Sequence, residues 1–106
     1  MIMDIYDPGF MKFCQSKSPS ETLKGILEGN IRGLDKIAFK NLSHRNQLPT
    51  VVVNVLLVYF FNAYKNTVYD RKNLARIYDY WVQQEVKTFS DALAMTDIDI
   101  TQLLKN

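Results

Sequence analysis

The longest apolar segment of the chain, residues 50–64, restricts the folds that are open to it. It follows Pro49 and reads Thr-Val-Val-Val-Asn-Val-Leu-Leu-Val-Tyr-Phe-Phe-Asn-Ala-Tyr, without a Gly or a second Pro. Its β-branched and aromatic residues are typical of strands, but the segment is much longer than the usual strand of about 5–6 residues. A helix that is buried on all sides explains both the length and the composition. The segment is too short to span a bilayer, which takes about 20 apolar residues.

Helical patterns cover most of the remaining sequence. Helices are predicted at residues 7–16, 18–29, 33–47, 71–86 and 88–95, and the tail, residues 97–106, permits a last turn at 100–104. Asp7, Ser18, Asp70 and Thr88 are the expected N-caps, and Glu21 and Asp91 complete capping boxes. With only 4 Gly and 3 Pro, the chain has few tight turns for a sandwich or barrel. We therefore predict an all-α fold: one domain of residues 1–106, a compact bundle of five or six short helices around a central apolar helix.

Cysteine and histidine usage excludes several classes of function. The single Cys14 excludes an internal disulfide and is typical of the reducing cytosol. With the single His44 it cannot build a common zinc site, and Asp97 and Asp99 lack the Gly and Glu of a calcium loop. The N-terminus lacks the pattern of a secretory signal. We expect a cytoplasmic protein without metal, cofactor, catalytic residues or membrane insertion.

The predicted helix at residues 71–86 has two distinct faces. Ile77 and the only tryptophan, Trp81, lie four residues apart and share one face of a helix with further apolar residues. This spacing predicts that Trp81 fills the core, although an aromatic ring can also stack on a nucleobase. The opposite face carries Lys72, Arg76 and Tyr80 at i, i+4 and i+8. Cations beside an aromatic ring suit a single-stranded nucleic acid, and a solvated helix face is the alternative.

Positive charge is concentrated in residues 32–76. This window contains eight Lys and Arg and two Asp, a net +6, whereas the whole chain carries +2. Arg32, Lys36 and Lys40 form a second basic row, opposite a stripe of Leu34, Ile37, Ala38 and Leu42. Lys65 and Arg71 are expected to assist the first row. Such concentration indicates an electrostatic footprint for nucleic acid; ordinary solubilising charge is the alternative.

Several segments resemble, in order, the DnaB/DnaD replication-initiation family of Gram-positive bacteria. Residues 73–81 resemble the family's Tyr-x-x-x-Ile-x-x-x-Trp signature, with Asn73 where the family has Tyr and with Ile77 and Trp81 in place. Leu48-Pro-Thr-Val-Val-Val-Asn-Val-Leu-Leu57 is similar to the family's segment around its central helix. Val86-Lys-Thr-Phe-Ser-Asp-Ala92 is similar to the step into its final helix. The resemblance covers about residues 7–95, is strongest at 48–93, and points to the DnaB branch, the helicase co-loaders.

The resemblance implies an all-α domain that binds DNA and helps to deliver the replicative helicase. Because family members are much longer than 106 residues, it implies the C-terminal helical domain alone or a stand-alone relative such as a phage replication protein. The implied partners are DNA, preferably single-stranded, and helicase-loading proteins, and a homo-oligomer is compatible with both. The alternative is a protein-interaction module that docks a helicase loader or a second copy through Ile98, Ile100, Leu103 and Leu104.

Overall fold

The helix predicted from the apolar segment lies at the centre of the fold. The computed structural model describes residue 5 and residues 7–65 and 67–104. Its helices are α1 (Phe10–Ser16), α2 (Pro19–Ile26), α3 (Gly33–Lys40), α4 (Thr50–Tyr64), α5 (Asn73–Gln83), α6 (Phe89–Met95) and α7 (Ile100–Leu103). The described residues contain no strand, so the all-α prediction is confirmed, with the permitted last turn of the tail as α7.

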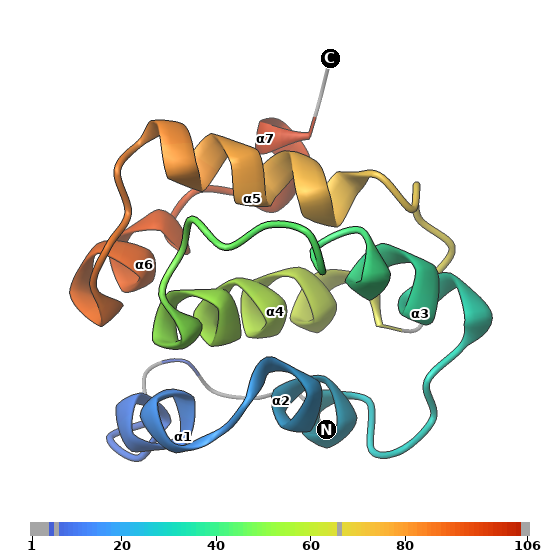
Figure 1. Cartoon of the computed structure of the whole chain (residues 1–106), viewed down its shortest axis with the longest axis horizontal. Helices are drawn as coiled ribbons and strands as arrows, with labels where there is room; N and C mark the ends of the chain where they lie inside the picture. The colour runs from blue at the N-terminus through green and yellow to red at the C-terminus, as the bar shows by residue number, and fades with distance from the viewer. Residues whose placement is uncertain (1–4, 6, 66, 105–106) are drawn as a thin grey trace.

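Neighbouring helices enclose α4 from several sides. In Figure 1, α1 and α2 lie along one side of α4, and α5 runs along the opposite side. The helices α1, α2, α5 and α6 each pack on α4, while α3 packs on α5. Every residue of α4 from 54 to 61 is buried. A helix without a solvent face needs apolar residues all round, which explains its strand-like composition.

The buried amide of Asn54 joins α4 to the end of α1. Its Nδ2 donates to the carbonyl oxygens of Cys14, at 2.8 Å, and Lys17, at 2.7 Å. The last carbonyls of a helix have no partner within the helix, so these bonds satisfy groups that burial would otherwise penalise. The polar residue inside the apolar segment therefore fixes how α1 sits on α4.

The predicted helix starts at Ser18 and Thr88 are confirmed, but of the two predicted capping boxes only the one at Ser18 is complete. The Ser18 hydroxyl accepts from the Glu21 amide at 3.2 Å, and the Glu21 carboxylate accepts from the Ser18 amide at 2.9 Å. The Thr88 hydroxyl accepts from the Asp91 amide at 3.0 Å, although the Asp91 carboxylate accepts from the Lys87 amide instead of the Thr88 amide. These caps depend only on residues within one turn, which is why the local sequence predicts them.

Other predicted boundaries were wrong. The helix predicted from Asp7 begins at Phe10, because the Asp7 carboxylate accepts from the Gly9 amide in a preceding turn. In the same way the Asp70 carboxylate holds a turn through the Lys72 amide, and α5 begins at Asn73. At its other end α5 stops at Gln83, where Glu85 adopts a positive φ of 57°.

The third predicted helix is shorter than expected and buries a different face. It ends at Lys40, and residues 41–44 form turns. Ile37, predicted to be in the core, is 44% exposed, whereas the Asp35 side chain is buried beside Ala38 and Leu42 on the inner face. The partners of Asp35, described below, explain why a carboxylate replaces an apolar residue there.

Candidate nucleic-acid interface

The two faces of α5 are separated as the sequence predicts. Ile77 and Trp81 are fully buried, and the Trp81 ring lies 6.0 Å from that of Tyr59 on α4. The core assignment of the signature residues is therefore confirmed, and the Trp81 ring is inaccessible to a nucleobase. On the opposite face, Lys72 and Arg76 are exposed and Tyr80 is half-buried.

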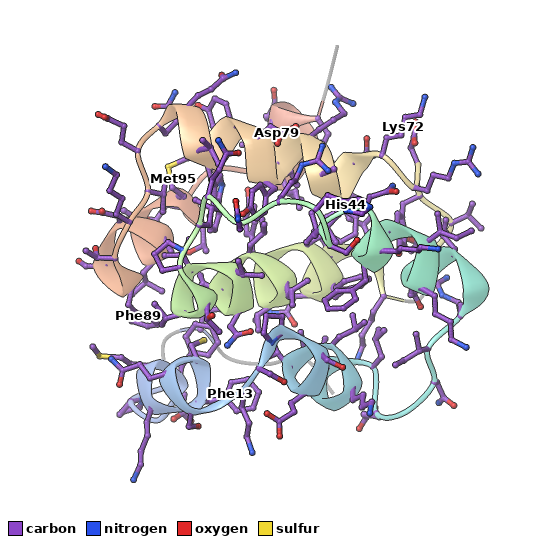
Figure 2. The ribbon with its side chains drawn as sticks, in the orientation of Figure 1. Phe13, His44, Lys72, Asp79, Phe89 and Met95 are labelled. Carbon is purple, nitrogen blue, oxygen red and sulfur yellow. The ribbon has the colours of Figure 1, made fainter. Side chains whose placement is uncertain are left out.

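A basic groove lies between α3 and the start of α5. We call it the α3–α5 groove; its volume is about 700 Å³ and its lining includes Ile37, Lys40, His44, Arg45, Arg71 and Lys72. His44, in the turn that follows α3, and Lys72, the residue before α5, both line the groove and are labelled in Figure 2. No Asp or Glu lines it. The groove thus joins cations of α3 and the loop after it with cations of the turn before α5, two segments that are distant in sequence, and the exposed Ile37 is an apolar part of its surface.

Hydrogen bonds fix the loop that carries His44 and Arg45 against α5. The Tyr78 hydroxyl accepts from the amides of Gln47, at 2.9 Å, and Leu48, at 3.0 Å. The Asn41 side-chain amide donates to the Arg71 carbonyl oxygen at 3.0 Å. These contacts span 30 or 31 residues of sequence and set the width of the α3–α5 groove.

Arg45 is paired with a carboxylate of α5. Its Nε donates to Asp79 Oδ1 at 2.9 Å and its Nη2 to Asp79 Oδ2 at 3.2 Å. The hydrogen bond to Asp79 raises the pKa of Arg45 above its ordinary value. Since both side chains are partly exposed, the pair adds little stability. Its main effect is to neutralise the one acidic side chain on the exposed face of α5.

A second groove flanks α5 on the side of the tail. We call it the α5–α7 groove; its volume is about 560 Å³ and its lining includes Arg76, Asp79, Tyr80, Gln83, Leu103 and Leu104. Leu103 and Leu104 are half-buried and pack on the core together with Tyr80. The exposed face of α5 therefore separates a basic groove from one with mixed polar and apolar walls.

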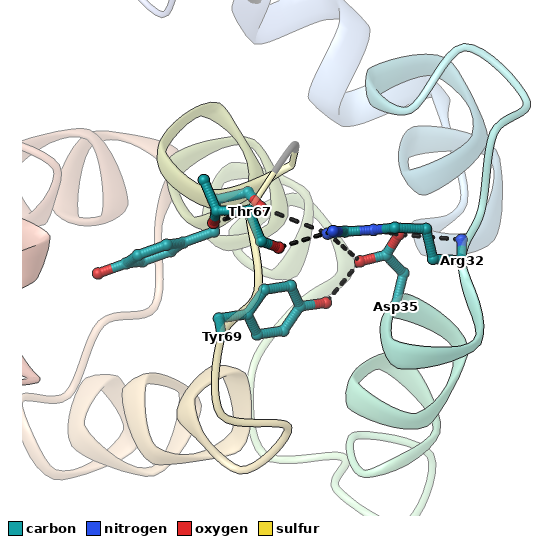
Figure 3. A network of polar contacts seen from close by, with 5 residues as sticks. Arg32, Asp35, Thr67 and Tyr69 are labelled. Atoms are coloured by element: carbon teal, nitrogen blue, oxygen red, sulfur yellow. Dashed lines mark hydrogen bonds and ion pairs between the residues drawn. The ribbon is translucent and has the colours of Figure 1, made fainter.

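Arg32 does not belong to the exposed basic row. Its Nε and Nη2 donate to the two carboxylate oxygens of Asp35, each at 3.0 Å, and its Nη1 donates to the Thr67 carbonyl oxygen at 2.6 Å. The Tyr69 hydroxyl donates to Asp35 Oδ1 at 2.6 Å (Figure 3). The guanidinium also lies 5.7 Å from the centre of the Tyr69 ring. This network ties α3 to the segment that follows α4.

The network also explains how Asp35 is buried as an anion. Burial alone would raise its pKa, but the hydrogen bonds from Arg32 and Tyr69 outweigh burial and hold the pKa of Asp35 below its ordinary value. Burial and the bond to Asp35 both raise the pKa of Tyr69. Arg32 therefore stabilises the fold and is not available as a phosphate ligand.

The remaining predicted residues divide into two groups. Lys36, Lys40, Arg71, Lys72 and Arg76 are exposed, and in the described part of the chain none of them forms an ion pair. Arg76 Nη1 donates to the side-chain oxygen of Asn73 at 3.1 Å, so the residue that departs from the family signature lies beside the basic face. Lys65 is the C-cap of α4 and lies near Glu28 at the end of α2, apart from both grooves.

Arg45 and His44 are the basic side chains lining the α3–α5 groove that the predicted site omits. Both follow α3 in a turn and loop whose path depends on Tyr78, and no short-range pattern in the sequence indicates that path.

Among the described residues there is no group of three or more His, Cys, Asp or Glu able to hold a metal ion. None of the described helices is long and apolar enough to cross a membrane.

Comparison with known proteins gave no match to any family model, curated protein or solved structure.

Proposed function

We propose that this domain binds single-stranded DNA through the exposed face of α5 and the α3–α5 groove. The observation that carries the proposal is a group of five exposed cations on α3, in the turn before α5 and on α5, none of which forms an ion pair among the described residues: Lys36, Lys40, Arg71, Lys72 and Arg76. Free cations on adjacent elements neutralise phosphates and release counterions, which supplies most of the sequence-independent affinity for nucleic acid.

The charge of the rest of the molecule supports this orientation. Because residues 32–76 carry +6 and the chain carries +2, all other residues together carry −4. The Arg45–Asp79 pair removes the carboxylate charge that would repel a phosphate beside Arg76. Positive charge is therefore concentrated in the part of the sequence that forms α3 and the start of α5, which favours the approach of a negatively charged strand there.

The preference for a single strand follows from the neighbourhood of the cations. Tyr80 lies one helical turn beyond Arg76 and is half-buried beside an open groove. In a duplex the bases are stacked on each other, whereas a single strand presents bases that an aromatic ring can stack on. Cations followed by an accessible ring are the combination that sequence-tolerant single-strand binding uses.

The cellular role that we propose rests on the resemblance to the DnaB/DnaD family. We propose an accessory domain in bacterial or phage replication initiation or restart that supports helicase loading. Within that role, the alternative of a protein-interaction module has a narrower basis: Ile98 is 38% exposed, but Ile100 is buried and both Leu103 and Leu104 are half-buried.

An amide NMR titration with a short single-stranded oligonucleotide tests the proposed surface. We expect chemical-shift changes at residues 36–45 and 71–83 and unchanged signals in α1 and α2. A duplex of the same sequence is the control and should bind more weakly. Shifts confined to α6 and the tail, or no shifts at low salt, would contradict the assignment.

A further inference from the structure

The α5–α7 groove has the chemistry of a small planar ligand site. Tyr80, Leu103 and Leu104, all half-buried, supply apolar surface, while the amide side chains of Gln83 and Gln102 are exposed at its edge. The Tyr80 hydroxyl forms no hydrogen bond with the described residues, so apolar packing holds this ring in the groove wall. The volume of about 560 Å³ is within the range of small-molecule sites.

A nucleobase matches these walls better than a charged or purely apolar ligand. Its flat faces stack on an aromatic ring, and its edge carries both donors and acceptors. An amide side chain offers two donors and an acceptor, so Gln83 and Gln102 can pair with the edge of different bases. The carboxylate of Asp79 also lines the groove but is held by Arg45, which limits its repulsion of a nucleotide.

The position of the groove connects it to the basic face. Arg76 is four residues from both Lys72 and Tyr80, which places it about 6 Å along the helix axis from each. It also forms part of the wall of the α5–α7 groove. A strand whose phosphates contact Lys72 and Arg76 therefore has its next base within reach of Tyr80.

We propose that the α5–α7 groove is a nucleobase subsite for single-stranded DNA, with Tyr80 as the stacking platform and Gln83 and Gln102 at the base edge. The inference rests on the proposed function, since the phosphates bring the strand to the groove. It adds that part of the binding affinity comes from contacts with the bases. A base makes these contacts in the groove between α5 and the tail.

Fluorescence anisotropy with two labelled strands of equal length tests this claim. One strand is oligo-dT, and the other is its abasic analogue with the same number of phosphates. We expect the wild type to bind oligo-dT roughly tenfold more tightly than the abasic strand. Tyr80→Leu, which keeps apolar packing against the tail, should bind both strands equally while its dependence on salt stays that of the wild type.

A second pair of variants keeps the test independent of folding at position 80. The double variant Gln83→Ala/Gln102→Ala, at two exposed positions, should reduce the preference for oligo-dT. The control Gln84→Ala, outside the groove, should leave that preference intact.

Equal binding of both strands by the wild type, with the salt dependence retained, would overturn the subsite and leave the proposed function standing. A preference that persists in Tyr80→Leu would overturn the placement of the base. If neither strand bound the wild type, the proposed function itself would be overturned.

Discussion

The Asp79 carboxylate on α5 pairs with the Arg45 guanidinium from the loop after α3, at 2.9 and 3.2 Å. The pair lies between the two grooves, since Arg45 lines the α3–α5 groove and Asp79 the α5–α7 groove. Asp79→Asn should therefore strengthen single-strand binding, because it removes a negative charge and releases a cation for phosphate. We expect the slope of log affinity against log salt to steepen by about 0.7.

The stability of Asp79→Asn should change by less than about 1 kcal/mol, as for exposed ion pairs. Asp7→Asn, on the exposed segment before α1, is the matched loss of one acid, and its binding should remain that of the wild type. Equal gains of affinity in both variants would attribute the effect to net charge and not to Arg45.

Asp35→Asn should destabilise the protein by about 2–3 kcal/mol at neutral pH, because charged hydrogen bonds to a buried group are lost. The pKa of Asp35 is lowered in the folded state, so its contribution is present above the unfolded pKa of about 3.9 and lost as the pH falls through the folded value. Urea unfolding between pH 7 and pH 3 measures this. The difference in stability between wild type and variant should shrink toward acid, and a constant difference would rule out Asp35 as the titrating group.

Trp81→Ala should cost about 3–5 kcal/mol of unfolding free energy, as expected for a large buried side chain. Trp81 Nε1 has no hydrogen-bond partner in the described structure, so Trp81→Phe loses volume but no hydrogen bond and should cost less. Chemical denaturation followed by circular dichroism measures both. A stable Trp81→Ala protein that has lost DNA binding would show that Trp81 contacts DNA and is not a core residue.

Tyr78→Phe should destabilise the protein by about 1–3 kcal/mol, since the buried Leu48 amide loses its acceptor. The amides of Gln47 and Leu48 should exchange with solvent faster in this variant, which hydrogen exchange measures. Tyr80→Phe is the matched control, because its hydroxyl has no partner among the described residues. Unchanged exchange at both amides would mean that the loop is held by other contacts.

The features that the sequence predicts correctly depend on residues within a single helix or turn. The starts at Ser18 and Thr88 are set by side chains that bond to backbone within one turn. The burial of Ile77 and Trp81 follows from a complete apolar stripe. The helical state of residues 50–64 is predicted from the length of the segment. Its hydrophobic periodicity cannot distinguish helix from strand, because the segment is apolar on all sides.

The features that the sequence predicts wrongly depend on contacts between residues that are distant in sequence. Helical geometry places Asp35 on the same face as Ala38 and Leu42, but a carboxylate is expected in solvent unless its partners are known. Tyr69, 34 residues later, and the pairing with Arg32 make its burial possible. For the same reason the sequence predicts Arg32 in an exposed row, whereas its guanidinium is bonded to Asp35. The α3–α5 groove depends in turn on the hydroxyl of Tyr78, which no local pattern connects to residues 44 and 45.

The most direct test of the DNA-binding surface is the salt dependence of oligonucleotide binding. With about four phosphates neutralised, log affinity of the wild type for a single strand should fall against log salt with a slope near −3. Lys72→Ala/Arg76→Ala should bring the slope to roughly −1.5, because two of those contacts are lost. The control Lys12→Ala/Lys24→Ala removes the same charge from exposed positions on α1 and α2 and should keep the wild-type slope. A slope unchanged in Lys72→Ala/Arg76→Ala, or reduced equally in the control, would contradict the assignment of binding to this face of α5.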